Sequence, residues 1–153
     1  MINWKVLEKN EYTQLWNLIY NDFIFSPYSS KKLIELPYPH IIYNISSHYD
    51  EGYSEIFYKN LHKYAVNYFK KISNGGRIYA LNWQHDCYSF DPYLPFEKDE
   101  FDEWLIPVFP NGDYLFFINN DLQEGVFCDG INLELSFFGQ QSVEILEHEN
   151  PIL

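Results

Sequence analysis

Few residues of this chain have the types and spacing that catalysis requires. His85 lies two positions before Cys87, so on a β-strand the imidazole and the thiol would share one face. A catalytic thiol also needs a nearby cation or helix N-terminus to lower its pKa, and the neighbouring sequence offers neither. No Gly-x-Ser-x-Gly motif occurs. The sequence therefore predicts no catalytic residues.

Histidine and glycine spacing gives no metal or phosphate site. No pair among the five histidines has the spacing of a zinc site, and no Cys-x-x-Cys occurs, so we expect no metal and no cofactor. His85, Asp86 and Asp113 would converge only if their turns lie side by side, and such turn residues more often cap the backbone or contact water. Gly75-Gly76 follows a predicted helix, which indicates a helix C-cap and not a phosphate loop.

An acidic, aromatic strip is the strongest candidate for a binding site. Five carboxylates crowd positions 97–103, Lys98 is the only base there, and the rings of Phe96, Phe101 and Trp104 are interleaved. The strip is either a solvated loop or a docking edge, where rings supply anchors and carboxylates steer a basic partner. The predicted partner-binding residues are Glu97, Asp99, Glu100, Phe101, Asp102 and Glu103.

The net charge limits the partners of the chain. The 22 acidic and 10 basic side chains give a formal charge of −12. Such a surface repels phosphate backbones, so we expect no nucleic-acid partner, whereas a basic protein would be attracted. Aromatic residues make up 20% of the chain, and Tyr and Trp suit half-buried binding faces. The acidity could instead serve only to maintain solubility, and the aromatic content could reflect a residue usage biased toward Tyr and Phe.

Secretion and membrane signals are missing from the sequence. Cys87 and Cys128 are too few for a disulfide framework and lie in apolar, strand-like contexts, which predicts buried reduced thiols. No basic-then-apolar stretch opens the chain, and its longest apolar runs, such as residues 114–118, are too short to cross a bilayer. We therefore expect a cytoplasmic protein with no membrane partner.

Two amphipathic helices are predicted in the first half of the chain. One spans residues 11–23, with Asn10 as its N-cap and apolar residues at spacings of three and four. The other spans about residues 56–72, carries a continuous apolar stripe, and ends at Asn74-Gly75-Gly76. A short third helix follows Gly139.

Strands dominate the second half of the chain. Alternating or continuous apolar runs predict strands at residues 40–46, 77–84, 87–90, 104–109, 114–118, 125–128 and 133–138. Asn111-Gly112 predicts a tight hairpin turn, and the near-continuous apolar run after it predicts a central strand covered on both faces. We therefore predict an α+β fold: an antiparallel meander of about five or six strands packed against two main, mostly N-terminal helices, in a single domain spanning 1–153.

Two strips of sequence resemble a known family. They are the run Leu81-Asn82-Trp83-Gln84-His85 and residues 104–114, which include Pro110-Asn111-Gly112-Asp113-Tyr114, with Phe138-Gly139 closing the pattern. Together they resemble an uncharacterised family of small bacterial proteins known only as a domain of unknown function. The chain departs from that family at Asn82, where Asp is expected, and around Gly130, where Pro and an aromatic residue are expected. The resemblance implies a single domain and no particular activity.

Two functional hypotheses follow. The first is an acidic, non-enzymatic protein-binding module, in its specific form an immunity-type protein that neutralises a basic bacterial toxin. The second is a small-molecule-binding or hydrolytic enzyme with a pocket at one end of the sheet. Its predicted pocket residues are Trp83, Gln84, His85, Asp113 and Tyr114, although the same residues could instead be core and turn residues. The oligomeric state stays open, and the partner could be only a second copy of the chain.

Overall fold

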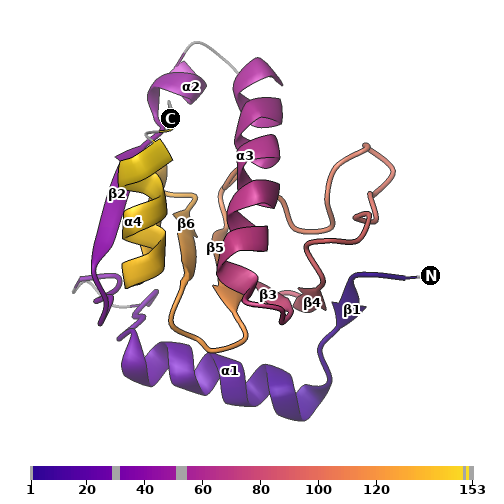
Figure 1. The fold of residues 1–153 in the computed structure, drawn as a ribbon. Helices are drawn as coiled ribbons and strands as arrows, with labels where there is room; N and C mark the ends of the chain where they lie inside the picture. The colour runs from indigo at the N-terminus through magenta and orange to yellow at the C-terminus, as the bar shows by residue number, and fades with distance from the viewer. Residues whose placement is uncertain (1, 29–31, 51–54, 150, 152–153) are drawn as a thin grey trace.

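An antiparallel sheet organises the fold (Figure 1). The computed structural model describes residues 2–28, 32–50, 55–149 and 151. Within these residues seven strands pair in the order β1-β4-β3-β5-β6-β7-β2, and every pairing is antiparallel. The strands are β1 (Lys5–Val6), β2 (His40–Asn44), β3 (Ile78–Asn82), β4 (Tyr88–Phe90), β5 (Tyr114–Asn119), β6 (Gly125–Asp129) and β7 (Glu134–Phe138).

Helices cover both faces of this sheet. The described helices are α1 (Lys9–Asp22), α2 (Ser47–Asp50), α3 (Glu55–Ser73) and α4 (Gln140–Glu149). In Figure 1, α3 and α4 lie side by side in front of the strands, and α1 crosses below them. The predicted α+β class is confirmed, with two main helices in the first half of the chain and a short one at the end.

The sheet separates two apolar cores. On β5, Leu115 and Phe117 pack in the core beneath α3 and α4. Phe116 and Ile118, which alternate with them, pack in the core beneath α1. Successive residues of a strand point to opposite faces, so a strand buried on both faces must be apolar throughout. The prediction of a doubly covered central strand at this position is confirmed.

The first helix buries the predicted face but starts earlier than predicted. Leu15, Trp16 and Ile19 are buried at spacings of one, three and four. The N-cap position belongs to Glu8, which makes no side-chain capping bond, so the prediction of Asn10 as N-cap was wrong. Asn10 lies inside the first turn, because sequence alone does not show where the chain leaves β1.

The long helix α3 matches its prediction closely. Its buried apolar positions follow one stripe that ends at Phe69 and Ile72. Asn74 and Gly75 then take φ angles of 51° and 81°, the left-handed conformation that ends a helix. The predicted stop signal is confirmed.

The predicted strand at residues 104–109 was wrong. Trp104, Ile106 and Val108 are buried in alternation, as the pattern requires, but no strand of the described chain forms there. The place beside β5 is taken by β3 and β6. Pro107 and Pro110 also lack the N–H that a central strand would donate. The segment therefore packs against α3 as irregular chain.

The predicted hairpin turn at Asn111-Gly112 was also wrong, because no strand precedes it. Gly112 has a φ of 81°, but Asn111 is not left-handed, whereas a type I′ turn needs both. Without a strand before it, Asn111-Gly112 is a bend that leads into β5. Cys87 and Cys128, in contrast, are buried and unbridged as predicted.

The N-terminal strand adds an edge that the sequence pattern did not reveal. The side chain of Asn3, 3% exposed, donates to the carbonyl of Asp91 at 2.9 Å and accepts the Asp91 N–H at 2.8 Å. Arg77 donates to the Asn3 carbonyl and to the Ser89 carbonyl, each at 2.8 Å. These bonds fix residues 3–6 against β4 and the loop that follows it.

Across the described helices, none is long and apolar enough to cross a membrane.

Candidate functional site

The acidic strip folds into a compact turn. The Asp99 carboxylate accepts the backbone N–H groups of Phe101 at 2.8 Å and Glu103 at 3.1 Å. The Asp99 N–H in turn donates to the Glu103 carbonyl at 2.7 Å, and Lys98 pairs with Trp104 as an isolated bridge. Asp99 therefore organises the turn through one oxygen of its carboxylate.

Glu97 has a similar internal role. Its carboxylate accepts the backbone N–H of Trp4 at 2.9 Å and the backbone N–H of Asn3. Desolvation acts to raise the pKa of the Glu97 carboxyl. The backbone hydrogen bonds act in the opposite direction and together outweigh desolvation, so the pKa lies below its ordinary value. Of the six predicted partner-binding residues, Glu97 and Asp99 thus hold the loop and the N-terminal segment in place.

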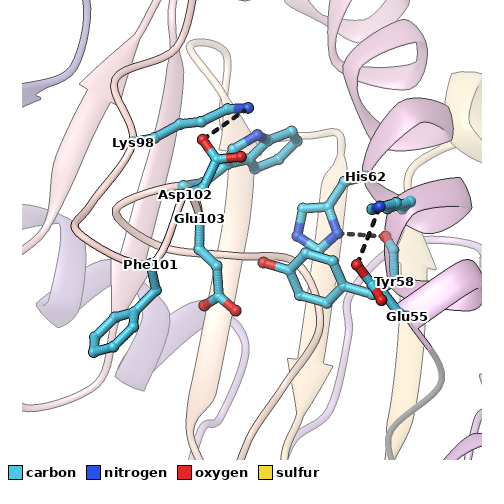
Figure 2. Close-up of a pocket in the computed structure, with 9 residues that line it drawn as sticks. Glu55, Tyr58, His62, Lys98, Phe101, Asp102 and Glu103 are labelled. Atoms are coloured by element: carbon cyan, nitrogen blue, oxygen red, sulfur yellow. Dashed lines mark hydrogen bonds and ion pairs between the residues drawn. The ribbon is translucent and has the colours of Figure 1, made fainter.

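The other four predicted residues project from the turn. Glu100 and Asp102 are exposed, and Phe101 is 75% exposed. Lys98 pairs with Asp102 at 3.5 Å. Figure 2 shows the Glu103 carboxylate directed toward the space between Phe101 and the ring of Tyr58 on α3.

That space is a pocket of about 530 Å³ between α3 and residues 98–104. Helix α3 forms one wall and the turn forms the other, as Figure 2 shows. The ring of Trp104, 8% exposed, belongs to the lining. The lining residues are Glu55, Tyr58, Lys59, His62, Lys98, Phe101, Asp102, Glu103 and Trp104.

His62, which lines this pocket, joins α3 to the irregular segment of residues 104–110. Its Nε2 accepts the backbone N–H of Val108 at 3.0 Å, so Nδ1 carries the proton and donates to the Tyr58 carbonyl at 2.8 Å. Desolvation lowers the pKa of His62 to about 4, although the bond to the Tyr58 carbonyl acts to raise it. A neutral imidazole with both nitrogens engaged is not available as a general base.

Charge in the pocket is nearly balanced, with one exception. Lys59 pairs with Glu55 at 3.1 Å, four residues earlier on α3, and Lys98 pairs with Asp102. Among the described residues, Glu103 has no ion-pair partner. A carboxylate without a cation, beside the rings of Tyr58 and Phe101, is suited to a basic group supplied from outside.

The second predicted site is divided between the two faces of the sheet. The Trp83 ring contacts Phe25, Tyr28 and Tyr114 on the α1 side, with centroid distances of 6.2, 5.0 and 6.0 Å. The Trp83 indole N–H donates to the Tyr20 hydroxyl at 3.0 Å. Trp83 and Tyr114 thus belong to one aromatic cluster, and Gln84, whose φ is 68°, donates from its amide to the Tyr28 hydroxyl.

Asp113 and His85 lie away from that cluster. Asn82 shares the α3 face of β3 with Ala80, and its amide contacts the Asp113 carboxylate at 3.4 Å. His85 is exposed in the turn after β3. The geometry therefore brings Trp83, Gln84 and Tyr114 together and does not gather all five predicted pocket residues.

The two thiols lack the surroundings of a nucleophile. Desolvation raises the pKa of Cys87 and, more strongly, that of Cys128. Cys87 contacts the backbone carbonyl of His85 and not its imidazole. No three His, Cys, Asp or Glu side chains in the described ranges are placed to hold a metal ion.

Sequence reasoning missed the wall of the pocket that α3 supplies. Tyr58, Lys59 and His62 flank the apolar stripe of α3, and only the Glu55–Lys59 spacing of four gave a local signal, an ordinary helix ion pair. Nothing in the sequence indicated that the acidic turn would close over this part of the helix.

Comparison with known proteins identifies the family. The chain is 32% identical over 158 residues to the uncharacterized protein YxiI of Bacillus subtilis (strain 168), and the match covers 100% of this chain and 98% of YxiI. No solved structure matches the chain significantly. Residues 6–143 match the family described as "Protein of unknown function (DUF2716)". The resemblance expected from the two sequence strips is confirmed, and the chain belongs to the DUF2716 family.

Proposed function

We propose that this chain is a non-enzymatic protein-binding module that accepts a basic side chain of a partner in the pocket between α3 and residues 98–104. One observation carries the proposal: Glu103 is directed into the pocket and has no ion pair among the described residues, whereas the other charged side chains that line the pocket are paired with one another. The partner is a protein with an exposed arginine or lysine cluster.

Arginine suits the pocket better than lysine. A guanidinium group can form two parallel hydrogen bonds with a carboxylate and can lie flat against an aromatic ring. Glu103 offers the carboxylate, and Tyr58 and Phe101 offer rings on either side of it. A cation over such a ring contributes about 0.5–2 kcal/mol, with the larger value where water is excluded.

Long-range attraction supports the same partner chemistry. A charge of −12 on a chain of this size draws basic proteins toward it and speeds their encounter. The exposed Glu100 and Asp102 extend the negative surface beyond the pocket. In this proposal they raise the association rate, and Glu103 with Phe101 determines how long the complex lasts.

The specific form of the proposal is an immunity-type protein that neutralises a basic toxin. A toxin that acts on a phosphate-rich substrate presents basic side chains in its substrate groove, and an acidic, aromatic surface can occupy that groove. This form adds one requirement to the proposal. The bound basic protein must lose its activity in the complex and regain it when Glu103 is replaced.

A peptide titration of the full chain tests the pocket. The probes are a blocked arginine–glycine peptide and the same peptide with citrulline, which keeps the shape and removes the charge. We expect the arginine peptide to shift the NMR signals of residues in the pocket and the citrulline peptide to shift none. Glu103→Gln should weaken binding by about tenfold, the loss of one charged hydrogen-bonded pair.

Glu100→Gln is the matched control. It removes the same charge from the same turn, but Glu100 does not line the pocket. We expect it to weaken binding by less than about twofold, as exposed ion pairs contribute little. Equal weakening by both variants would show that the peptide is held by nonspecific charge attraction and not by the pocket. Absence of binding by the arginine peptide would refute the proposal.

A further inference from the structure

Strand β2 forms one open edge of the sheet. It pairs with β7 on one side, and no strand of the described chain pairs with its other side. The opposite edge of the sheet is β1, which has only two residues and begins with an exposed lysine. Lysine and short length are the usual protections against edge-to-edge pairing. Strand β2 has five residues, His-Ile-Ile-Tyr-Asn, with no lysine, proline or carboxylate.

Hydrogen-bond parity shows which groups β2 presents outward. The Pro39 carbonyl accepts the Gly139 N–H at 2.8 Å, and the Ile45 N–H donates to the Leu133 carbonyl at 2.8 Å. In an antiparallel pair every second residue bonds to the neighbouring strand, so Ile41 and Tyr43 also face β7. The N–H and C=O groups of His40, Ile42 and Asn44 therefore point away from the sheet.

We infer that two copies of this chain pair along β2 in antiparallel orientation, with Ile42 beside Ile42 of the second copy. The three outward residues are symmetric about Ile42, so a twofold axis there matches each N–H with a C=O. His40 then pairs with Asn44 of the second copy, and the reverse pair repeats the same bonds. A twofold interface requires this kind of self-complementary patch.

Side chains at this edge favour the pairing. Ile42 is 51% exposed, an unusual state for a branched apolar residue in the middle of a strand, and pairing would cover it. Ile42 also lines a cavity of about 450 Å³ whose other walls include Leu33, Ile34 and Leu36. Its lining also carries the carboxylates Glu35, Asp129 and Glu134. Residues of the second copy on this face of the joined sheet would lie against the apolar part of this opening.

Charge sets the expected strength and its dependence on salt. Each copy carries −12, so two copies repel each other, but β2 itself contributes no carboxylate to the junction. Salt screens this repulsion, and at physiological ionic strength the screening length is about 8 Å. The dimer should therefore become tighter as salt rises, the reverse of what a dimer held by ion pairs would do.

The pocket beside α3 stays open in this dimer. It borders residues 98–104, toward the β4 end of the sheet, whereas β2 lies at the other end (Figure 1). The inference is thus independent of the proposed function. Failure of one leaves the other standing, because the first is measured by self-association and the second by peptide binding.

Sedimentation equilibrium of the full chain at two salt concentrations tests the inference. We expect a monomer–dimer equilibrium, tighter at the higher salt. Ile42→Pro removes an outward N–H that no bond within the sheet uses, and proline is tolerated at such edge positions. It should weaken the dimer by at least about tenfold. Ile42→Thr keeps the N–H and the β-branched shape, and it should weaken the dimer less than Ile42→Pro does.

Hydrogen exchange of the unaltered protein gives a readout that depends on no variant. The Ile42 amide should become protected as protein concentration rises, whereas the Ile41 and Tyr43 amides should be protected at every concentration because they bond to β7. A chain that stays monomeric at all concentrations overturns the inference. A dimer in which Ile42 exchanges as fast as in the monomer, or one that Ile42→Pro leaves unchanged, also overturns it.

Discussion

Val108 donates its backbone N–H to Nε2 of His62 across 3.0 Å, and this bond fastens the irregular segment of residues 104–110 to helix α3. It gives a buried backbone donor the partner that a sheet would otherwise provide. It also fixes the neutral tautomer of a histidine whose pKa is lowered to about 4 by desolvation.

Stability should therefore depend on pH through His62. In the unfolded chain the imidazole has its ordinary pKa of 6.5. Between about pH 4 and 6.5 the unfolded state binds the additional proton, so the free energy of unfolding falls as pH falls through this window. The full contribution, roughly 3 kcal/mol, is present above pH 6.5 and lost near pH 4.

Denaturant unfolding at several pH values measures this slope. His62→Gln keeps an acceptor near the Nε2 position but does not titrate, so the variant should lose most of the slope in this window. His85→Gln, at an exposed histidine, is the control and should keep it. An unchanged slope in His62→Gln would show that His62 is not the group responsible.

Glu97→Gln and Glu100→Gln form a matched pair of variants that tests the structural role of Glu97. Glu97→Gln replaces a carboxylate that accepts two backbone N–H groups by a neutral amide, and it should destabilise the fold by about 1 kcal/mol, a value reduced by partial exposure to water. The pKa of Glu97 is below its ordinary value, so this stabilisation is present above the unfolded pKa and is lost as pH falls through the folded pKa.

Glu100→Gln should leave stability within about 0.5 kcal/mol of the unaltered protein, because this side chain is exposed and makes no structural contact in the described chain. Thermal unfolding near neutral pH compares the two variants. Equal stability of both would contradict the anchoring role given to Glu97, whereas the peptide-binding test of Glu103 would be unaffected.

Local sequence signals account for much of the fold but not for the site. The stripe of α3 and the stop at Asn74-Gly75 were predictable because periodicity and capping act within a few residues. The segment at 104–109 was not, because its alternation is the same whether the chain pairs in a sheet or packs on a helix. That choice depended on His62, 46 residues away from Val108.

The candidate site shows the same division. The acidic turn was recognisable from its composition, but composition did not distinguish Glu97 and Asp99, which bond to backbone, from Glu103, which faces a pocket. The contact of Glu97 with Trp4 joins residues 93 positions apart. No pattern within one stretch of sequence carries such information.

A buried hydroxyl network joins α3, β6 and α4. The Tyr68 hydroxyl donates to the Gly125 carbonyl at 2.8 Å and accepts from Ser142 Oγ at 2.7 Å. Tyr68→Phe leaves both partners buried without it, so we expect a loss of about 1–3 kcal/mol in the free energy of unfolding. Tyr93→Phe, at an exposed ring, should lose much less. Chemical denaturation of both variants decides whether the hydroxyl matters.

Gly139 immediately precedes α4 with a φ of 105°, and a side chain there would collide with the Glu124 carboxylate. That carboxylate is nearly buried and accepts the Ser142 N–H at 2.6 Å in the first turn of α4, where a negative charge is favourable. Gly139→Ala should therefore strain the backbone and displace the carboxylate together. Gly75→Ala isolates the first effect, because Gly75 has a φ of 81° and open space around it.

We expect Gly75→Ala to cost about 1 kcal/mol and Gly139→Ala at least about 3 kcal/mol. Glu124→Ala removes the carboxylate, so in the double variant Gly139→Ala/Glu124→Ala the collision is gone. The stability losses of the two single variants should therefore sum to more than the stability loss of the double variant. Denaturant unfolding of the four variants gives the coupling. Additive losses, or equal losses at Gly75 and Gly139, would show that the close approach of Glu124 to Gly139 does not determine how α4 begins.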